Sequence, residues 1–250
     1  MTLKEFFVDE VITIPFKLFG KTHLFLMFLV LVGLILVFLN RKRIYGVSKN
    51  LKRKIVVVFA IILLLNMIIL YVSSFYYHTF DYKTMLPLHL CYLSNYFYIF
   101  VVLLNREKWY PYLYFLAFLG PIPAIIFFDV PSVWESFNFY LYIISHHLLV
   151  LMGLFTFYLY PKKINLKHLV KLFVVLNILY FLMNIFNIYF HTNYFFTGSI
   201  PPFILELLPF LKYFPVVIIL EIMEIIIIGS LYLFYQRQQE FTKKGSYDII

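Results

Sequence analysis

Long apolar runs, separated by short polar segments, make up most of the chain. An α-helix rises about 1.5 Å per residue, so roughly 20 apolar residues cross a hydrocarbon core about 30 Å thick. The hydropathy pattern predicts about seven such spans, with ends set to within a few residues. They are His23–Leu39, Ile55–Tyr77, Pro87–Leu104, Tyr110–Phe128, Phe139–Tyr160, His168–Phe190 and Tyr213–Tyr235. The predicted fold class is all-α, a polytopic transmembrane helical bundle.

Composition agrees with this fold class and narrows the expected partners. The chain is 63% hydrophobic and 13% charged, which leaves too little charge to cover the surface of a soluble domain. The basic residues behind its formal net charge of +9 lie in short loops between the apolar runs rather than on one binding face. We therefore expect membrane lipids as partners and no nucleic acid, and the oligomeric state stays open.

The distribution of basic residues among the loops predicts the orientation. The loop between the first two spans and the loop between the fifth and sixth are rich in Lys and Arg, whereas the alternate loops carry few. Cytoplasmic loops of membrane proteins carry this excess. We expect a multi-pass protein of the cell membrane with its N-terminus outside and its C-terminus in the cytoplasm, which requires an odd number of spans.

The predicted organisation has three parts. Residues 1–22 form an outer N-terminal segment, residues 23–235 form the seven-helix transmembrane domain, and residues 236–250 form a cytoplasmic tail. The first part is either an interfacial helix bent at Pro15 or a loosely ordered lead-in. Within the second part, residues 192–209 predict an outer loop with a short re-entrant or interfacial piece. The apolar face of the first part would contain Phe6, Phe7, Val11, Ile14 and Leu18.

Most polar side chains within the spans fall in the outer half of the membrane in this orientation. Lipid offers them no hydrogen-bond partner, so each must face the bundle interior or a wet cavity. One interpretation is a shared polar pocket that opens outward, and it suits the histidines, the cysteine and Glu221. The other is a set of separate helix–helix hydrogen bonds, and it suits Asn66, Ser73, Ser74 and Asn177.

The candidate chemistry centres on Cys91, the single cysteine of the chain. On a regular helix His89 and Cys91 point about 200° apart, so a base for the thiol must come from another helix. His146 and His147 lie at a matching depth and are the candidate bases. Glu221 is placed to orient one of them, as the third member of a triad.

Asn95 is a further candidate for the site, and two alternatives to a catalytic Cys91 stay open. Asn95 shares a helix face with Cys91 and is a candidate hydrogen-bond donor to an oxyanion. A lone buried cysteine can instead be an inert, small apolar residue. A metal site built from His89, Cys91, His146 and Glu221 lacks the i, i+4 spacing of helical zinc ligands, so we expect no metal and no cofactor.

Three short motifs resemble those of the YwaF family of bacterial integral membrane proteins, which is related to the eukaryotic transmembrane protein 164 family. They are LPLHLC at Leu86–Cys91, ISHH at Ile144–His147 and TNY at Thr192–Tyr194. The similarity extends from about the second span to the seventh. It departs at His191, where the family usually has Gly before TNY, and at residues 207–210, where the family's Gly-Pro-Trp-Pro run is absent.

The resemblance implies a function that the residues alone do not. The eukaryotic relatives are cysteine-dependent acyltransferases that act on phospholipids, so the resemblance implies Cys91 as the acyl-accepting nucleophile and His146 or His147 as its base. The alternative is a non-enzymatic lipid-binding protein, transporter or flippase that uses the same pocket. The expected substrate-binding residues are His89, Asn95, Asn184, Asn187, Asn193, Tyr194 and Glu221.

Overall fold

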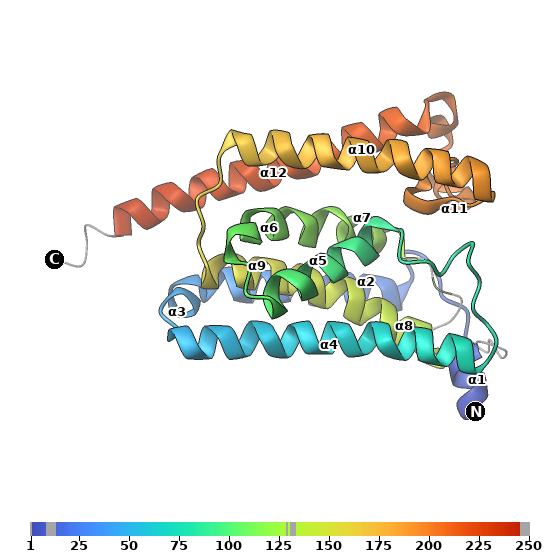
Figure 1. Ribbon diagram of the computed structural model, residues 1–250, viewed down its shortest axis with the longest axis horizontal. Helices are drawn as coiled ribbons and strands as arrows, with labels where there is room; N and C mark the ends of the chain where they lie inside the picture. The colour runs from blue at the N-terminus through green and yellow to red at the C-terminus, as the bar shows by residue number, and fades with distance from the viewer. Residues whose placement is uncertain (1, 9–13, 129, 131–133, 246–250) are drawn as a thin grey trace. The chain divides into compact units, whose positions relative to one another are not determined.

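The computed structural model describes residues 2–8, 14–128, 130 and 134–245. Every regular element in these ranges is a helix (Figure 1), which confirms the predicted all-α class. Six helical segments are long and apolar enough to cross a membrane, and a shorter apolar helix matches the remaining predicted span. The chain forms two compact units, unit 1 (Met1–Lys162) and unit 2 (Lys163–Ile250).

Unit 1 contains the first five predicted spans. They correspond to α2, α4, α5, the pair α6–α7 and the segment α8–η2–α9, in which η2 is a π-helix. The bounds are α1 Leu3–Val8, α2 Lys21–Leu39, α3 Arg41–Tyr45, α4 Lys49–Tyr76, α5 Leu90–Leu103, the 3-10 helix η1 Glu107–Trp109, α6 Tyr110–Leu119, α7 Pro121–Ile126, α8 Phe137–Ile143, η2 Ile144–Leu148 and α9 Leu149–Leu159.

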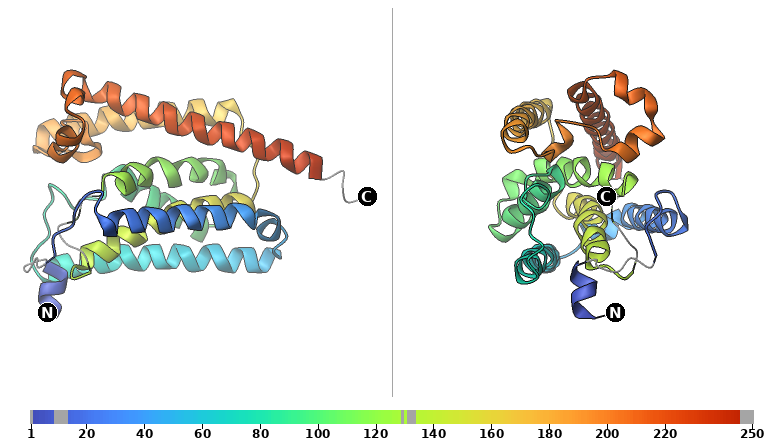
Figure 2. Two further views of the ribbon diagram at one scale, coloured as in Figure 1. Left: turned by 180° about the vertical axis from the view of Figure 1, so that it is seen from behind. Right: turned by 90° about the vertical axis from the view of Figure 1, so that its right-hand side faces the viewer.

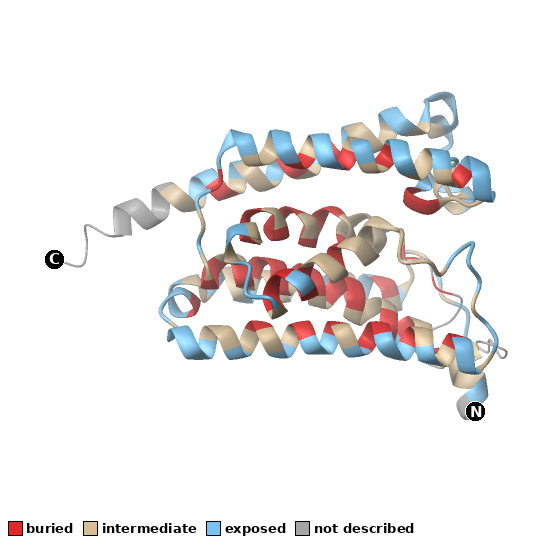
Figure 3. Cartoon of the chain, viewed as in Figure 1, coloured by how far each residue is buried: buried red, intermediate tan, exposed pale blue. Residues whose placement is uncertain are grey.

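Helix α9 lies in the middle of unit 1, where it contacts α2, α3, α4, α6 and α7 (Figure 2). Buried residues concentrate on α6 and α9 and on one side of α5 (Figure 3). A Cβ on Gly153 of α9 would clash with the Cβ of Ala117 on α6, so these two helices approach closely. Close approach through small residues is typical of helices that pack within a membrane.

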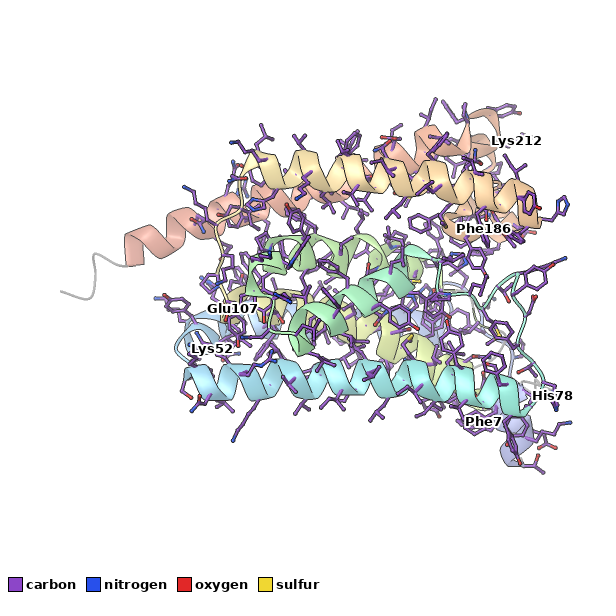
Figure 4. All side chains as sticks on the ribbon, viewed as in Figure 1. Phe7, Lys52, His78, Glu107, Phe186 and Lys212 are labelled. Carbon is purple, nitrogen blue, oxygen red and sulfur yellow. The ribbon has the colours of Figure 1, made fainter. Side chains whose placement is uncertain are left out.

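The two ends of unit 1 carry different loops. Lys52 and Glu107 lie at one end, and Phe7 and His78 lie at the other (Figure 4). At the first end Lys162 forms an ion pair with Glu107, with 2.7 Å between nitrogen and oxygen. The basic loop between the first two spans and the loop after the fifth therefore meet at one end of the unit, as the alternation of loops predicts.

Arg53, near the start of α4, fixes the end of α5. Its guanidinium donates to the backbone oxygen of Val102 and, at 3.1 Å, to that of Leu103. The last carbonyls of a helix lack partners within the helix, and a basic side chain satisfies them and complements the helix dipole. Arg53, which the sequence places between the first two predicted spans, thus contributes to the packing between α4 and α5.

The N-terminal helix α1 packs on unit 1 through aromatic side chains. The ring centroid of Phe7 lies 4.9 Å from that of Phe137 on α8 and 5.8 Å from that of Tyr77 at the end of α4. Phe6 lies 6.0 Å from Phe137, in an edge-to-face arrangement. Such pairs contribute about 0.5–1.5 kcal/mol each. Of the predicted apolar face, Val11 lies outside the described residues.

Unit 2 holds the last two predicted spans, α10 and α12. These long helices run in opposite directions along the unit (Figures 1 and 2). Their side chains are mostly exposed or half-buried (Figure 3), as expected for surfaces that face lipid. Short helical turns occupy the segment predicted as an outer loop. The bounds are α10 Leu166–Phe190, η3 Tyr194–Phe196, α11 Pro202–Leu207, η4 Pro209–Tyr213 and α12 Val216–Gly245.

Three spans of unit 1 are irregular, which the hydropathy pattern does not reveal. Helix α5 has 14 residues and is about 21 Å long, less than a core of roughly 30 Å. The hydrogen-bond ladder of the fourth span is interrupted at Pro121 and Pro123, which lack N–H groups. The fifth span contains the π-helix. Irregular backbone at membrane depth is tolerated where protein buries it or where it lines a wet cavity.

Candidate functional site

The three irregular spans meet at Cys91. Helix α5 begins at Leu90 and not at the predicted Pro87, and His89 is its N-cap. Cys91 is therefore in the first turn of α5, where backbone N–H groups lack partners within the helix. Cys91 as a whole residue is half-buried, and the N–H groups of Cys91 and Tyr92 lie close to its thiol.

His89 lies outside α5, so the angle predicted between His89 and Cys91 is wrong. That prediction assumed helical backbone at both residues, but His89 has an extended backbone with φ −70° and ψ 148°. Its imidazole is near enough to His146 to interact with it electrostatically. The LPLHLC and ISHH motifs are therefore neighbours in unit 1.

Gly120 permits the first turn of α5 to reach the junction of α6 and α7. A Cβ on Gly120 would lie 3.0 Å from both the N and the Cα of Cys91 and 2.9 Å from Oγ of Ser94. Real Cβ atoms do not tolerate such distances without displacement of their neighbours. The sequence alone marks Gly120 only as an isolated glycine before Pro121, and its role follows from this contact.

The π-helix η2 carries Ser145, His146 and His147, and all three are buried. A π-helix makes i→i+5 hydrogen bonds and occurs mostly as a single wide turn at functional sites. Two of its side chains bind carbonyls of the preceding turn: Ser145 Oγ donates to Leu141 O at 2.8 Å, and His146 Nδ1 donates to Tyr142 O at 2.8 Å. These bonds hold the wide turn open.

Asn95 links the π-helix to the first turn of α5. Its Nδ2 donates to the backbone oxygen of Cys91 at 2.9 Å and to that of Ser145 at 3.0 Å. Both N–H groups of the amide are therefore in use, and the oxyanion donation predicted for Asn95 is not available in this arrangement. The remaining atom, Oδ1, is buried and has no hydrogen-bond partner among the described residues.

The two adjacent histidines have different surroundings. The ring of His146 stacks on Tyr142 with centroids 4.0 Å apart. Because its Nδ1 donates to a carbonyl, the neutral ring presents Nε2 as a hydrogen-bond acceptor. His147 meets Phe128 edge-on with centroids 5.9 Å apart, and neither of its ring nitrogens has a partner among the described residues. His146 is therefore the better base.

Cys91 and His146 are linked only indirectly. The Cys91 thiol has the backbone N–H groups of Cys91 and Tyr92 as its neighbours, and Asn95 supplies the connection between its turn and the π-helix. Catalytic hydrogen bonds are often absent before a substrate is bound. A direct bond between Cys91 and His146 stays a prediction.

His23 is a buried histidine that the sequence marks only as the start of a span. Its Nδ1 accepts from the N–H of Phe19 at 2.9 Å, and its Nε2 donates to the carbonyl of Ile125 at 2.8 Å. Its side chain is fully buried, and both ring nitrogens are satisfied. His23 therefore fastens the start of α2 to the end of α7, and we assign it a structural role.

The four residues for which the sequence favours separate helix–helix hydrogen bonds all bind backbone carbonyls. Asn66 of α4 donates to Leu141 O on α8 at 3.3 Å, which confirms the predicted helix–helix hydrogen bond. For the rest the prediction of a bond between helices is wrong, because each binds a carbonyl one turn earlier in its own helix. Ser73 and Ser74 donate to Leu70 O, and Asn177 donates to Phe173 O.

In unit 2, Asn187 organises the loop that follows α10. Its Nδ2 donates to Tyr194 O at 2.7 Å and to Thr197 Oγ1 at 2.8 Å. Its Oδ1 accepts from Thr192 Oγ1 at 2.7 Å and from Tyr194 N at 2.8 Å. Every donor and acceptor site that an amide side chain offers is therefore used.

The TNY motif of the same loop has a structural explanation. Asn193 binds the backbone of the following turn: its Nδ2 donates to Ser199 O at 2.9 Å, and its Oδ1 accepts from Gly198 N at 3.2 Å. Tyr194 is fully buried. His191, the C-cap of α10, has the left-handed conformation with φ 53° and ψ 47°. Glycine adopts that conformation most readily, which explains the glycine that the family usually has there.

Asn184 and Glu221, on α10 and α12, are half-buried. Glu224, one turn after Glu221, is buried, and its ionisable neighbours are Glu221 and Tyr180 of α10. The substrate-binding roles predicted for Asn184, Asn187, Asn193, Tyr194 and Glu221 stay predictions. Among the described residues, no group of three or more His, Cys, Asp or Glu side chains is arranged to hold a metal ion.

The fold and this site define a class of protein: a multi-pass helical membrane protein whose buried polar groups gather at interrupted helices. The chain belongs to the TMEM164 family, whose model matches residues 18–235. This match confirms the resemblance seen in the three motifs. No curated protein and no solved structure matches the chain.

Proposed function

We propose that this protein is a cysteine-dependent acyltransferase that moves a fatty acyl group from a phospholipid to a lipid hydroxyl. The observation that carries the proposal is the Asn95 side chain, which ties the turn of Cys91 to the π-helix that bears His146. A thiol, an imidazole and irregular backbone gathered within an apolar bundle are typical of a functional site. Membership in the TMEM164 family agrees with this proposal.

In the first half of the reaction, Nε2 of His146 takes the proton of the Cys91 thiol. The thiolate attacks the ester carbonyl of the donor lipid, so a C–S bond forms and the ester C–O bond breaks. The leaving oxygen takes the proton from His146. In the second half, the acceptor hydroxyl gives its proton to His146 and attacks the thioester, and the thiolate recovers that proton.

The oxyanion that forms at the carbonyl needs hydrogen-bond donors. Asn95 has none to spare, because both of its N–H groups bind carbonyls. The backbone N–H groups of Cys91 and Tyr92 lie near the thiol in the first turn of α5. Backbone N–H groups at a helix N-terminus stabilise developing negative charge, so we assign the oxyanion to this turn.

The test uses the fact that the chain has one cysteine. Purified protein in vesicles of phosphatidylcholine with a radiolabelled acyl chain should acquire a label that neutral hydroxylamine removes, the signature of a thioester. Cys91→Ser should abolish that label, and His146→Ala should slow its formation by about 10²–10⁴-fold. Cys91→Ser should keep the thermal unfolding midpoint of the parent protein, and the rate in His146→Ala is compared at equal amounts of folded protein.

A parent protein that binds phospholipid but never forms the thioester would overturn the proposal. That result would favour the non-enzymatic alternative, a lipid-binding protein, transporter or flippase.

A further inference from the structure

Asn95 has one atom whose bonding capacity is unused. Its Nδ2 faces the carbonyl oxygens of Cys91 and Ser145, and a flipped amide would set Oδ1 against both of them. The two carbonyls therefore fix the orientation of the side chain. Its Oδ1 is left without a partner among the described residues, although only 1% of the residue's surface is exposed.

The chemistry of this atom defines what it can bind. A buried polar atom without a hydrogen bond is rare, because it gives up water and gains nothing in return. An amide oxygen only accepts hydrogen bonds, so its ligand must bring an O–H or N–H group. An oxyanion or an ester carbonyl is therefore excluded, and the polarity is the reverse of the one predicted from the sequence.

The position of Asn95 places that ligand beside the nucleophile. Asn95 follows Cys91 by one helical turn, and side chains in this relation are about 5–6 Å apart. Its amide also contacts Ser145, the residue before His146. His146 presents Nε2 as a second acceptor, because its Nδ1 already donates to Tyr142 O. The two acceptors thus come from segments in contact, one of which carries Cys91.

The number of hydrogens on the ligand distinguishes the candidates. An alcohol has one hydroxyl hydrogen, so it can donate to Asn95 Oδ1 or to His146 Nε2 but not to both. Water has two and can donate to both at once, and a buried water typically makes two to four hydrogen bonds. The pair of acceptors therefore fits water better than it fits a lipid hydroxyl.

We propose that Asn95 Oδ1 and His146 Nε2 hold a water molecule that hydrolyses the acyl-Cys91 thioester, giving the protein a second activity that releases free fatty acid. The water gives one proton to His146 Nε2, and its oxygen attacks the thioester carbonyl. A C–O bond forms, the C–S bond breaks, and the thiolate takes the proton from His146. The products are a fatty acid and the free thiol. This inference rests on the acyl-enzyme of the proposed function.

The experiment measures how one acyl-enzyme divides between two products. Protein with radiolabelled acyl-Cys91 in vesicles is given lysophosphatidylcholine, and free fatty acid and phosphatidylcholine are counted. Because both products come from the same thioester, their ratio is independent of how much protein is folded or acylated. Asn95→Leu should lower the ratio of fatty acid to phosphatidylcholine by about tenfold.

One further variant sharpens the test. Asn66→Leu is the matched control, since Asn66 is also a buried asparagine that donates to a carbonyl near the π-helix. It should leave the ratio unchanged.

An unchanged ratio in Asn95→Leu overturns the inference, and so does an acyl-Cys91 of the parent protein that persists without an acceptor lipid. Transfer of the label to a lipid amine as an amide would assign the two acceptors to an amine and would also overturn it. A protein that never forms acyl-Cys91 fails earlier, at the proposed function itself.

Discussion

Two buried asparagines, one in each unit, use their side chains in opposite ways. Asn187 in unit 2 is 4% exposed, and its amide makes four hydrogen bonds within the loop that it organises. Asn95 in unit 1 is 1% exposed, and its amide makes two hydrogen bonds and leaves the oxygen unused. Residue type and burial are the same, so neither separates a structural residue from a functional one. Under the proposed function, the unused acceptor marks Asn95 as the functional one.

The surroundings of the two residues follow the same division. The loop around Asn187 closes on itself, and its polar groups bind one another. The region around Asn95 combines a π-helix, a late helix start and His147, whose two ring nitrogens also lack partners among the described residues. This contrast between the two regions supports the proposed ligand site beside Asn95.

The largest expected effect is on stability, from Asn187→Leu. The variant loses four hydrogen bonds, two of them to the backbone N–H and C=O of Tyr194, at a cost of about 2–4 kcal/mol in the free energy of unfolding. Asn95→Leu should cost less, about 1–2 kcal/mol, because it also removes an acceptor that has no partner. Thermal unfolding in detergent, followed by far-UV circular dichroism, compares the two variants. Equal losses would contradict the distinction drawn between them.

The next largest effect is expected from Gly120→Ala, because Gly120 lies close to the backbone of Cys91. Gly120→Ala pushes a methyl group against the backbone of Cys91 and should cost about 1–3 kcal/mol of stability, as overpacking does. It should also slow thioester formation, because the first turn of α5 must move. Gly229→Ala is the control, since nothing lies within 4 Å of its Cβ position. Formation of acyl-Cys91 at the parental rate in Gly120→Ala would show that the approach does not matter to the reaction.

The smallest expected effect is a gain in stability, from His191→Gly. His191 has a left-handed backbone, which costs a residue with a side chain about 1 kcal/mol relative to Gly. His191→Gly should therefore raise the free energy of unfolding by about that amount and leave the product ratio of the Asn95 experiment unaltered. The measurement is the same thermal unfolding. A loss of stability would mean that the imidazole makes a contact that outweighs the backbone strain.

Hydropathy predicts the regular part of this fold well, because lipid imposes a simple rule on helix length and polarity. The predicted spans ending at Leu39 and Phe190 end at the same residues in the structure, as α2 and α10. The ISHH motif at residues 144–147 and the cysteine at position 91 can also be identified from the sequence. Their side chains are polar or reactive, and such side chains are uncommon in apolar spans.

The irregular parts of the fold cannot be predicted from hydropathy. The π-helix depends on Ser145 and His146 binding carbonyls of the preceding turn, and nothing in hydropathy distinguishes that pattern from an α-helix. The closeness of Gly120 to Cys91 and the contact of Asn95 with Ser145 join segments far apart in the chain. These contacts arise from packing, so they appear only when the helices are placed together.

The brevity of α5 has a consequence for the bilayer around it. A 14-residue helix is mismatched with a hydrocarbon core of roughly 30 Å, and membranes respond to a short hydrophobic element by thinning locally. The ester groups of the surrounding lipids then sit closer to the start of α5 than in an undisturbed leaflet. Under the proposed function, this deformation would bring the carbonyl of the donor lipid toward Cys91, with no need to extract a whole lipid from its leaflet.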